Sequence, residues 1–166
     1  MPGGGTRALD ELRRAGVAHT VHAYEPPEPS GRSRDGRPHY GEAAAAALGV
    51  DPRRIHKTLV ANLDGRLVVA IVPVAAELDL KALAGALGGR KAAMADPTEA
   101  ERATGYVRGG ISPLGQRRRL STVLDRAALE WPTIHVSAGR RGLQVELAPA
   151  DLVRLTGAVT ATLARR

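Results

Sequence analysis

The sequence predicts a single α/β domain built around a mixed β-sheet or barrel. Alternating apolar segments occur in pairs that are typical of antiparallel hairpins, and short helical segments interrupt them. A doubly wound fold would instead show strands and helices in regular alternation. No internal repeat or linker divides the 166 residues, a length typical of one domain that buries its own core. We therefore expect one domain over residues 1–166.

The first part of the chain predicts two helices separated by a strand and a long loop. Residues 6–15 carry leucines at helical spacing before the stop signal Gly16, and residues 19–24 alternate with the period of a strand. Residues 25–39 contain four prolines and almost no apolar side chains, which predicts an exposed loop. The alanine-rich residues 41–48 favour a helix.

The middle of the chain contains the clearest hairpin. Two apolar segments, residues 55–62 and 67–74, flank Asp64-Gly65, a dipeptide that favours a tight turn with positive φ. Leucines at helical spacing then predict a helix over residues 78–87, which a Gly-Gly pair ends.

The C-terminal half is predicted as short strands and helices. Asp96 or Thr98 can cap a helix that runs through Ala103, because both side chains accept hydrogen bonds from free backbone amides. Alternation and apolar content predict strands over residues 92–94, 120–124, 133–136 and 142–147, and a closing helix that opens with residues 149–155.

Residues 103–120 stand out, because they hold four glycines, one proline and four arginines between ordinary apolar segments. We predict a binding loop here. Gly109 and Gly110 allow positive φ and close approach of a ligand, since neither carries a Cβ. Exposed amides in such a turn attract an anion or a polarised carbonyl oxygen, and the arginines that follow suit a substrate with phosphate groups. A tight connection without a function is the alternative.

The composition favours a polyanionic partner. The chain carries a formal net charge of +7, and arginine outnumbers lysine by 21 to 3. It has no cysteine, which excludes disulfides, thiolate metal sites and a cysteine nucleophile. It shows neither a secretory signal nor an apolar run of about 20 residues that could span a bilayer, so we expect a cytoplasmic protein.

A few polar side chains are candidates for chemistry. Lys57 shares the apolar face of its predicted strand with Ile55 and Leu59, where a lysine is rare unless it has a partner or a task. His22 and His56 are candidate general bases, but neither has the carboxylate and serine of a recognisable triad. The five histidines show no metal-ligand spacing, so we expect no metal and no cofactor.

Six blocks of the chain fall in the order and spacing of a known family. They are residues 57–59, 73–81, 94–97, 104–106, 109–115 and 136–143. Together they resemble the YbaK family of aminoacyl-tRNA deacylases, which is related to the editing domain inserted in bacterial prolyl-tRNA synthetases. The similarity runs from about His19 to the C-terminus. Two features depart from the family pattern: residues 27–39 look like an insertion, and Gln144 stands where an aspartate is expected.

The resemblance implies a compact fold with a curved mixed sheet. It also implies an activity that removes cysteine from mischarged tRNA, chiefly from tRNA(Pro) and secondarily from tRNA(Cys). It implies prolyl-tRNA synthetase as a nearby partner. It assigns catalysis to Lys57, Gly109 and Gly110. The substrate-binding residues that it implies are Tyr24, Tyr40, Thr58, Ile111, Ser112, Ser137 and Gln144. The excess of arginines over acidic residues favours contacts with tRNA phosphates. The arginines that we expect to make them are Arg117, Arg118, Arg119, Arg140 and Arg141.

Because the chain offers no thiol and no triad, we expect the thiol of a cysteinyl substrate, or an ordered water, to attack the ester. Two alternatives remain at this stage. Gln144 in place of a carboxylate leaves room for a tRNA- or nucleotide-binding module without turnover. The same deacylation directed at another small aminoacyl-tRNA, such as Ala-tRNA, is the second.

Overall fold

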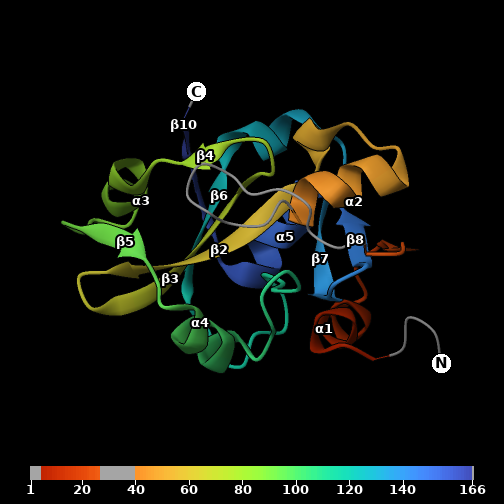
Figure 1. Ribbon diagram of the computed structural model, residues 1–166, viewed down its shortest axis with the longest axis horizontal. Coiled ribbons are helices and arrows are strands. Elements are labelled where there is room, and N and C mark those ends of the chain that lie inside the picture. The colour runs from red at the N-terminus through yellow and green to blue at the C-terminus, as the bar shows by residue number, and fades with distance from the viewer. Residues whose placement is uncertain (1–4, 27–39, 166) are drawn as a thin grey trace.

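The computed structural model describes residues 5–26 and 40–165, and for residues 40–42 it describes the backbone alone. The predicted insertion at residues 27–39 lies outside these residues, as does the side chain of Tyr40. Within the described residues, the largest sheet is mixed and helices surround the sheets, as predicted (Figure 1).

A five-stranded sheet forms the centre of the fold, in the order β5-β2-β3-β6-β9. Strand β2 pairs antiparallel with β3 and β5, whereas β6 pairs parallel with β3 and β9, so the sheet is mixed. The strands are β2 (His56–Leu63), β3 (Arg66–Pro73), β5 (Ala92–Met94), β6 (Ser121–Asp125) and β9 (Val159–Ala161).

A three-stranded antiparallel sheet, in the order β1-β8-β7, stands beside the central sheet. Its strands are β1 (Thr20–Ala23), β7 (Ile134–Arg140) and β8 (Leu143–Leu147). A parallel bridge between Ile55 and His135 joins the two sheets. The start of β2 therefore borders β7, while its end, residues 61–63, borders β5. A short antiparallel pair, β4 (Glu77–Leu78) with β10 (Ala164–Arg165), completes the pairings of the described residues.

The central sheet carries apolar side chains on both faces, and helices cover each face. The main core lies between β3, β6, β7 and β8 and the helices α1 (Arg7–Ala15) and α5 (Pro149–Thr156), and its buried side chains include Leu9, Ile71 and Val136. On the other face, α3 (Leu80–Ala86) packs on β2 and β3, and α2 (Tyr40–Leu48) packs on Ile55. In Figure 1, α3 and β5 lie at one end of the molecule, and α2 lies over the end that holds β7 and β8.

The predicted hairpin is confirmed. Asp64 and Gly65 both have positive φ, 52° and 92°, which is the conformation that the Asp-Gly signal favours. The Asp64 carboxylate also accepts hydrogen bonds from the backbone amides of Arg90 and Lys91 at 2.8 and 2.9 Å. These bonds tie the turn to the segment that leads into β5, and they lower the pKa of Asp64. The predicted cap of the next helix is also confirmed, since the Asp96 carboxylate accepts hydrogen bonds at the start of α4 (Pro97–Thr104).

Three predictions of secondary structure need correction. Leu78 belongs to strand β4, and α3 begins only after Asp79, whose carboxylate accepts a hydrogen bond from the Ala82 amide. Strand β7 continues to Arg140, beyond the predicted 133–136, because its pairing with β8 resumes after a bulge between Ser137 and Arg140. The predicted closing helix is not the last element, because β9 and β10 follow α5 after Gly157.

Candidate active site

The polar face of the three-stranded sheet carries most of the predicted substrate-binding side chains. His22, Gln144 and Ser137 are paired across β1, β8 and β7, and side chains that are paired in this way lie on the same face. The neighbouring positions Val136 and Val145 face the main core instead. Alternation along these strands therefore separates a face that packs on the main core from a face that carries the predicted substrate-binding side chains.

Tyr24 and Gln144 interact directly on this face. Burial raises the pKa of Tyr24 above its usual value, while hydrogen bonds from the Gly142 backbone and the Gln144 side chain act in the opposite direction. Tyr24 packs against the small cluster of Ile55 and the α2 alanines. Gln144 is buried, and its Oε1 atom makes no hydrogen bond with the described residues. A buried amide oxygen without a donor is costly, so this atom is a ready acceptor for an amine or hydroxyl of a substrate.

Lys57 lies on β2 opposite Val72, and it shares its face with Leu59, as the predicted alternation required. Its side chain is partly buried and has interaction partners of its own. The parallel bridge from Ile55 to His135 aligns the two strands, so Lys57 and Ser137 both follow it by two residues. This alignment brings the predicted catalytic lysine toward the polar face of the small sheet.

Thr58 does not share this arrangement. Because it follows Lys57 directly on a strand, its side chain points to the opposite face. Its Oγ1 atom is buried there without a hydrogen-bond partner among the described residues. His56 occupies the same face, and burial lowers its pKa. The structure therefore separates Thr58 and the candidate base His56 from the side chain of Lys57.

The glycine-rich loop is ordered by its own contacts. Gly109 has φ of 85°, and the Gly110 amide donates to the Val107 carbonyl at 2.9 Å, which closes a tight turn. The Tyr106 hydroxyl donates to the Leu114 carbonyl at 2.6 Å. Burial of this phenol raises the pKa of Tyr106 to about 12.

These contacts change the roles expected within the loop. The amide of Gly110 is already occupied by the turn, so an amide aimed at a substrate oxygen has to come from Gly109 or Ile111. Ser112 is fully buried, and its Oγ atom accepts a hydrogen bond from the Leu114 amide at 3.2 Å. Ile111 is partly buried against the main core. The two side chains thus support the loop from beneath.

The loop is packed against the turn between β7 and β8. A Cβ atom added to Gly110 would lie only 2.7 Å from the Cα of Arg140. The Arg141 guanidinium donates from Nε to the Arg108 carbonyl at 2.8 Å. Glycine at position 110 is therefore required by space, and the loop adjoins the strands that carry Ser137 and Gln144.

The predicted tRNA-contacting arginines occupy two places. Arg140 and Arg141 are exposed at the β7–β8 turn, next to the glycine-rich loop. Arg117, Arg118 and Arg119 are exposed where the loop returns to the central sheet. Two of them, Arg118 and Arg119, line a shallow pocket together with residues of α5 and β6. Arg117, Arg118 and Arg119 thus belong to the end of the loop, whereas Arg140 and Arg141 reach it through the packing of the β7–β8 turn against Gly110.

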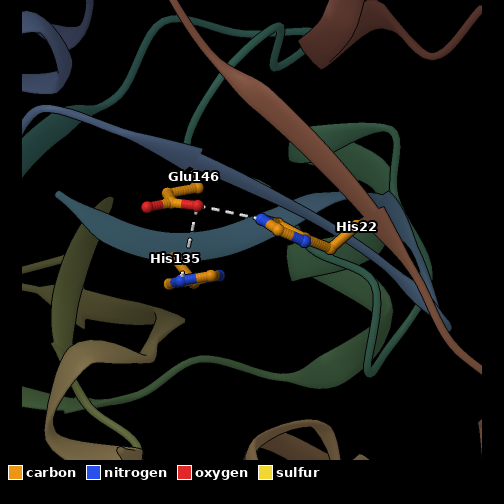
Figure 2. A group of neighbouring side chains, drawn as sticks. All are labelled: His22, His135 and Glu146. Atoms are coloured by element: carbon orange, nitrogen blue, oxygen red, sulfur yellow. Dashed lines mark hydrogen bonds and ion pairs between the residues drawn. The ribbon is translucent and has the colours of Figure 1, made fainter. Parts of the chain in front are cut away.

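Sequence reasoning missed a cluster of His22, His135 and Glu146, which come from three different strands. Figure 2 shows the Glu146 carboxylate directed at both histidines. Its Oε1 atom lies 2.9 Å from Nε2 of His22 and 4.0 Å from Nε2 of His135. His22 therefore has a carboxylate partner that the sequence did not reveal, although the cluster contains no serine and so forms no triad. Only the pairing of β1 with β8, and of β8 with β7, brings these residues together, and no local spacing signals it.

The second oxygen of Glu146 is held from the other side. Its Oε2 atom accepts hydrogen bonds from the Thr133 hydroxyl at 2.5 Å and from Arg54 at 3.2 Å. Hydrogen bonds from Thr133 and His22 lower the pKa of Glu146 to about 2, so this carboxylate is ionised at neutral pH. Burial lowers the pKa of His135 to about 4, so its imidazole is neutral at neutral pH.

None of the helices in residues 5–26 and 40–165 has the length and apolar character needed to cross a membrane.

A family model, two curated relatives and a solved structure that resemble this chain all carry descriptions of aminoacyl-tRNA editing or deacylation. Residues 39–155 match the model of the family described as the aminoacyl-tRNA editing domain. The chain is 46% identical over 117 residues to the "Putative Cys-tRNA(Pro)/Cys-tRNA(Cys) deacylase EbsC" of Enterococcus faecalis, covering 69% of this chain and 71% of that protein. It is 31% identical to the "Multifunctional Ser/Thr-tRNA deacylase ProXp-y" of Escherichia coli K12, covering 69% of each. A solved structure described as a "putative trans-editing enzyme for prolyl tRNA synthetase" superposes with a TM-score of 0.77 at 26% identity, covering 96% of both chains.

Proposed function

The chain belongs to the aminoacyl-tRNA editing domain family, and we propose that it is a trans-acting deacylase that removes cysteine from mischarged tRNA(Pro). The name of the relative from Enterococcus faecalis supports this choice of aminoacyl group, because that protein is the most similar of those compared above. The net charge of +7 supports a tRNA substrate, since phosphates dominate the affinity of proteins for nucleic acids.

The observation that carries the proposal is the convergence of polar groups on one face. Tyr24, Ser137 and Gln144 share the polar face of the small sheet, and Lys57 approaches it along β2. The Oε1 atom of Gln144 is a buried acceptor without a donor, which suits the ammonium group of an aminoacyl ester. The glycine-rich loop adjoins the same strands and can present the amides of Gly109 and Ile111 to the ester carbonyl.

We propose that the substrate supplies the nucleophile. The sulfur of the cysteinyl group attacks its own carbonyl carbon, and the bond from that carbon to the ribose oxygen breaks. The thiol proton ends on the ribose oxygen, so the products are free tRNA and a cyclic thioester that water can open. Holding the two reacting groups together raises their effective concentration greatly, which lets this step proceed without a protein nucleophile. Lys57 stabilises the negative charge that develops on the departing oxygen.

A panel of aminoacyl-tRNAs tests the proposed activity. Purified protein is incubated with cysteinyl-, seryl-, alanyl- and prolyl-tRNA(Pro), and release of the amino acid is followed. We expect cysteine to be removed much faster than serine, because a hydroxyl is the weaker nucleophile at neutral pH. A preference for serine would overturn the choice of cysteine and move the chain toward the activity named for the ProXp-y relative. Binding without release of any amino acid would support the non-catalytic module instead.

A second experiment tests the nucleophile alone. Cysteinyl-tRNA is compared with its S-methylated form, which is larger by one methyl group and has no free thiol, and binding of both is measured alongside cleavage. We expect the methylated substrate to bind and to resist cleavage. Cleavage of both at the same rate would show that a water positioned by the protein attacks the ester.

A partnership with prolyl-tRNA synthetase, proposed from the relation to editing domains, is tested by co-migration of the two proteins in gel filtration with and without tRNA(Pro).

A further inference from the structure

The cluster of His22, His135 and Glu146 has the composition of a metal site. Each residue offers one nitrogen or oxygen atom, and the three atoms lie within 4.8 Å of one another. They belong to three adjacent strands of one sheet, so the backbone fixes their positions. We propose that this cluster binds a divalent transition metal ion of the zinc type. The cluster lies on the same face of the sheet as Gln144, which is two residues before Glu146 on β8, but it includes none of the side chains proposed to bind the substrate.

The spacing of the donor atoms suits a tetrahedral ion. Zinc bonds of about 2.0–2.1 Å to nitrogen and oxygen place neighbouring donors roughly 3.3 Å apart. The distances from Oε1 of Glu146 to the histidines are 2.9 and 4.0 Å, one below and one above this value. Rotation of the partly exposed His22 side chain can lengthen the first distance, whereas the second requires the Glu146 and His135 side chains to approach each other by roughly 0.7 Å when the ion binds. Two imidazoles and one carboxylate are a donor set that zinc uses in open sites.

The surroundings of Glu146 hold it in the required orientation. Thr133 and Arg54 bind Oε2, which leaves Oε1 directed at the two histidines (Figure 2). Partners that fix a ligating carboxylate in this way are a regular part of metal sites. The carboxylate is ionised at neutral pH, as a ligand must be. The positive charge of Arg54 opposes a dication, so we expect moderate rather than very tight affinity.

His135 presents one ring nitrogen to the proposed ion. Its side chain is 2% exposed, and Nε2 is directed at Glu146 from 4.0 Å, which is too far for a hydrogen bond. A metal ion between His135, His22 and Glu146 would give Nε2 a bonding partner. The other nitrogen, Nδ1, is buried without a hydrogen-bond partner in the described part of the chain, and the ion would leave it so.

This proposal revises the expectation of no metal site, which was based on the spacing of histidines in the sequence. Ligands that come from paired strands need no local spacing, because the register of the sheet sets their separation. A bound ion would link the edge strand β1 to β7 and β8. It would therefore act first on the stability of this sheet, whether or not it affects the deacylation.

Metal binding is tested on untagged, chelator-treated protein by titration with Zn²⁺ in a calorimeter, and with Co²⁺ by its visible absorption. We expect one ion per chain, an absorption band of tetrahedral intensity, and a rise in the thermal midpoint on adding Zn²⁺. Mg²⁺ should give neither heat nor a stability change, since it prefers an octahedral shell of oxygens.

Substitutions identify the ligands. His22→Ala and Glu146→Gln should each weaken Zn²⁺ binding by at least tenfold, as losses of single ligands do. His19→Ala, three residues from His22 on the same segment, is the matched control and should leave binding unchanged. His135→Ala is less decisive because its side chain is buried, so circular dichroism is used to confirm that each variant is folded. Absence of stoichiometric binding, equal binding by folded His22→Ala, or equal loss in His19→Ala would overturn the proposal.

Discussion

Replacing Gly110 with alanine tests whether the glycine-rich loop must fit closely against the β7–β8 turn. The added Cβ would lie 2.7 Å from the Cα of Arg140, 2.9 Å from its carbonyl carbon and 3.0 Å from the Arg141 amide nitrogen. All three are backbone atoms, so no side chain can rotate away. An ordinary contact begins at 3.4 Å, so the loop or the turn has to move by about 0.7 Å. Gly110 has no positive φ, so crowding is the only objection to alanine here.

Crowding of this kind typically destabilises a protein by about 1–3 kcal/mol. In a chain of this length each kcal/mol lowers the thermal midpoint by about 2–4 °C, so we expect a fall of about 2–12 °C. A displacement approaching 1 Å beside the reacting groups can also reduce turnover by about 10²-fold. The two effects are measured separately, by thermal unfolding and by release of cysteine from cysteinyl-tRNA(Pro).

Gly85→Ala is the matched control, because a Cβ added at this position of α3 meets nothing within 4 Å. Alanine there should raise stability by about 0.5–1 kcal/mol and leave turnover unchanged, since glycine is unfavourable within a helix. If Gly110→Ala unfolds at the wild-type temperature and keeps its activity within about twofold, the close packing of the loop has no consequence and our reasoning fails. If only stability falls, the loop supports the fold and is not part of the active site.

Three further predictions concern charge. Lys57→Ala should abolish deacylation. Lys57→Arg should impair it nearly as much, because a planar guanidinium cannot occupy the position of an ammonium. Near-normal turnover of Lys57→Arg in the same assay would show that any cation suffices. Affinity for tRNA, measured by fluorescence anisotropy, should fall by about 10³-fold between 50 and 200 mM salt if about six phosphates are contacted, and a flat response would place recognition in the pocket alone. The pKa of Tyr106 is raised to about 12, so its neutral form stabilises the fold below the ordinary pKa near 10, and this contribution is lost as the pH rises from about 10 to 12. Ultraviolet titration should accordingly show one tyrosine that ionises last and is absent in Tyr106→Phe, and simultaneous ionisation of all tyrosines near pH 10 would contradict the buried hydrogen bond to Leu114.

Much of the fold was predictable because local signals were strong. The Asp64-Gly65 turn, the Asp96 cap and the helix before Gly16 each depend on the backbone preferences of one or two residues, and the structure confirms all three. The errors occur where tertiary contacts decide. Leu78 has the spacing of a helix, but it pairs with Ala164 in a short strand that only the folded chain creates. Strand β9 was missed because its three residues carry no pattern of their own and form a strand beside β6.

The candidate site divides in a similar way. The alternation of β2 correctly placed Lys57 with Leu59, and the pairing of β7 with β8 brings Ser137 and Gln144 side by side. The family resemblance implied a substrate-binding role for Thr58 next to Lys57, but adjacent residues of a strand face opposite ways. The cluster of His22, His135 and Glu146 could not be found from sequence, since it depends on the register of two separate strand pairs.

The bridge between Ile55 and His135 has a consequence for the register of the proposed site. Within the described residues, it is the one backbone pairing that joins the three-stranded sheet to the central sheet. Ile55 precedes Lys57 by two residues and His135 precedes Ser137 by two residues, so this pairing sets which residue of β7 lies level with Lys57. The main core packs across the same junction, because it contains side chains of β3 and β6 together with those of β7 and β8. A one-residue insertion between Ile55 and Lys57 would therefore turn the lysine to the other face of its strand while the packing that joins the sheets stays in place.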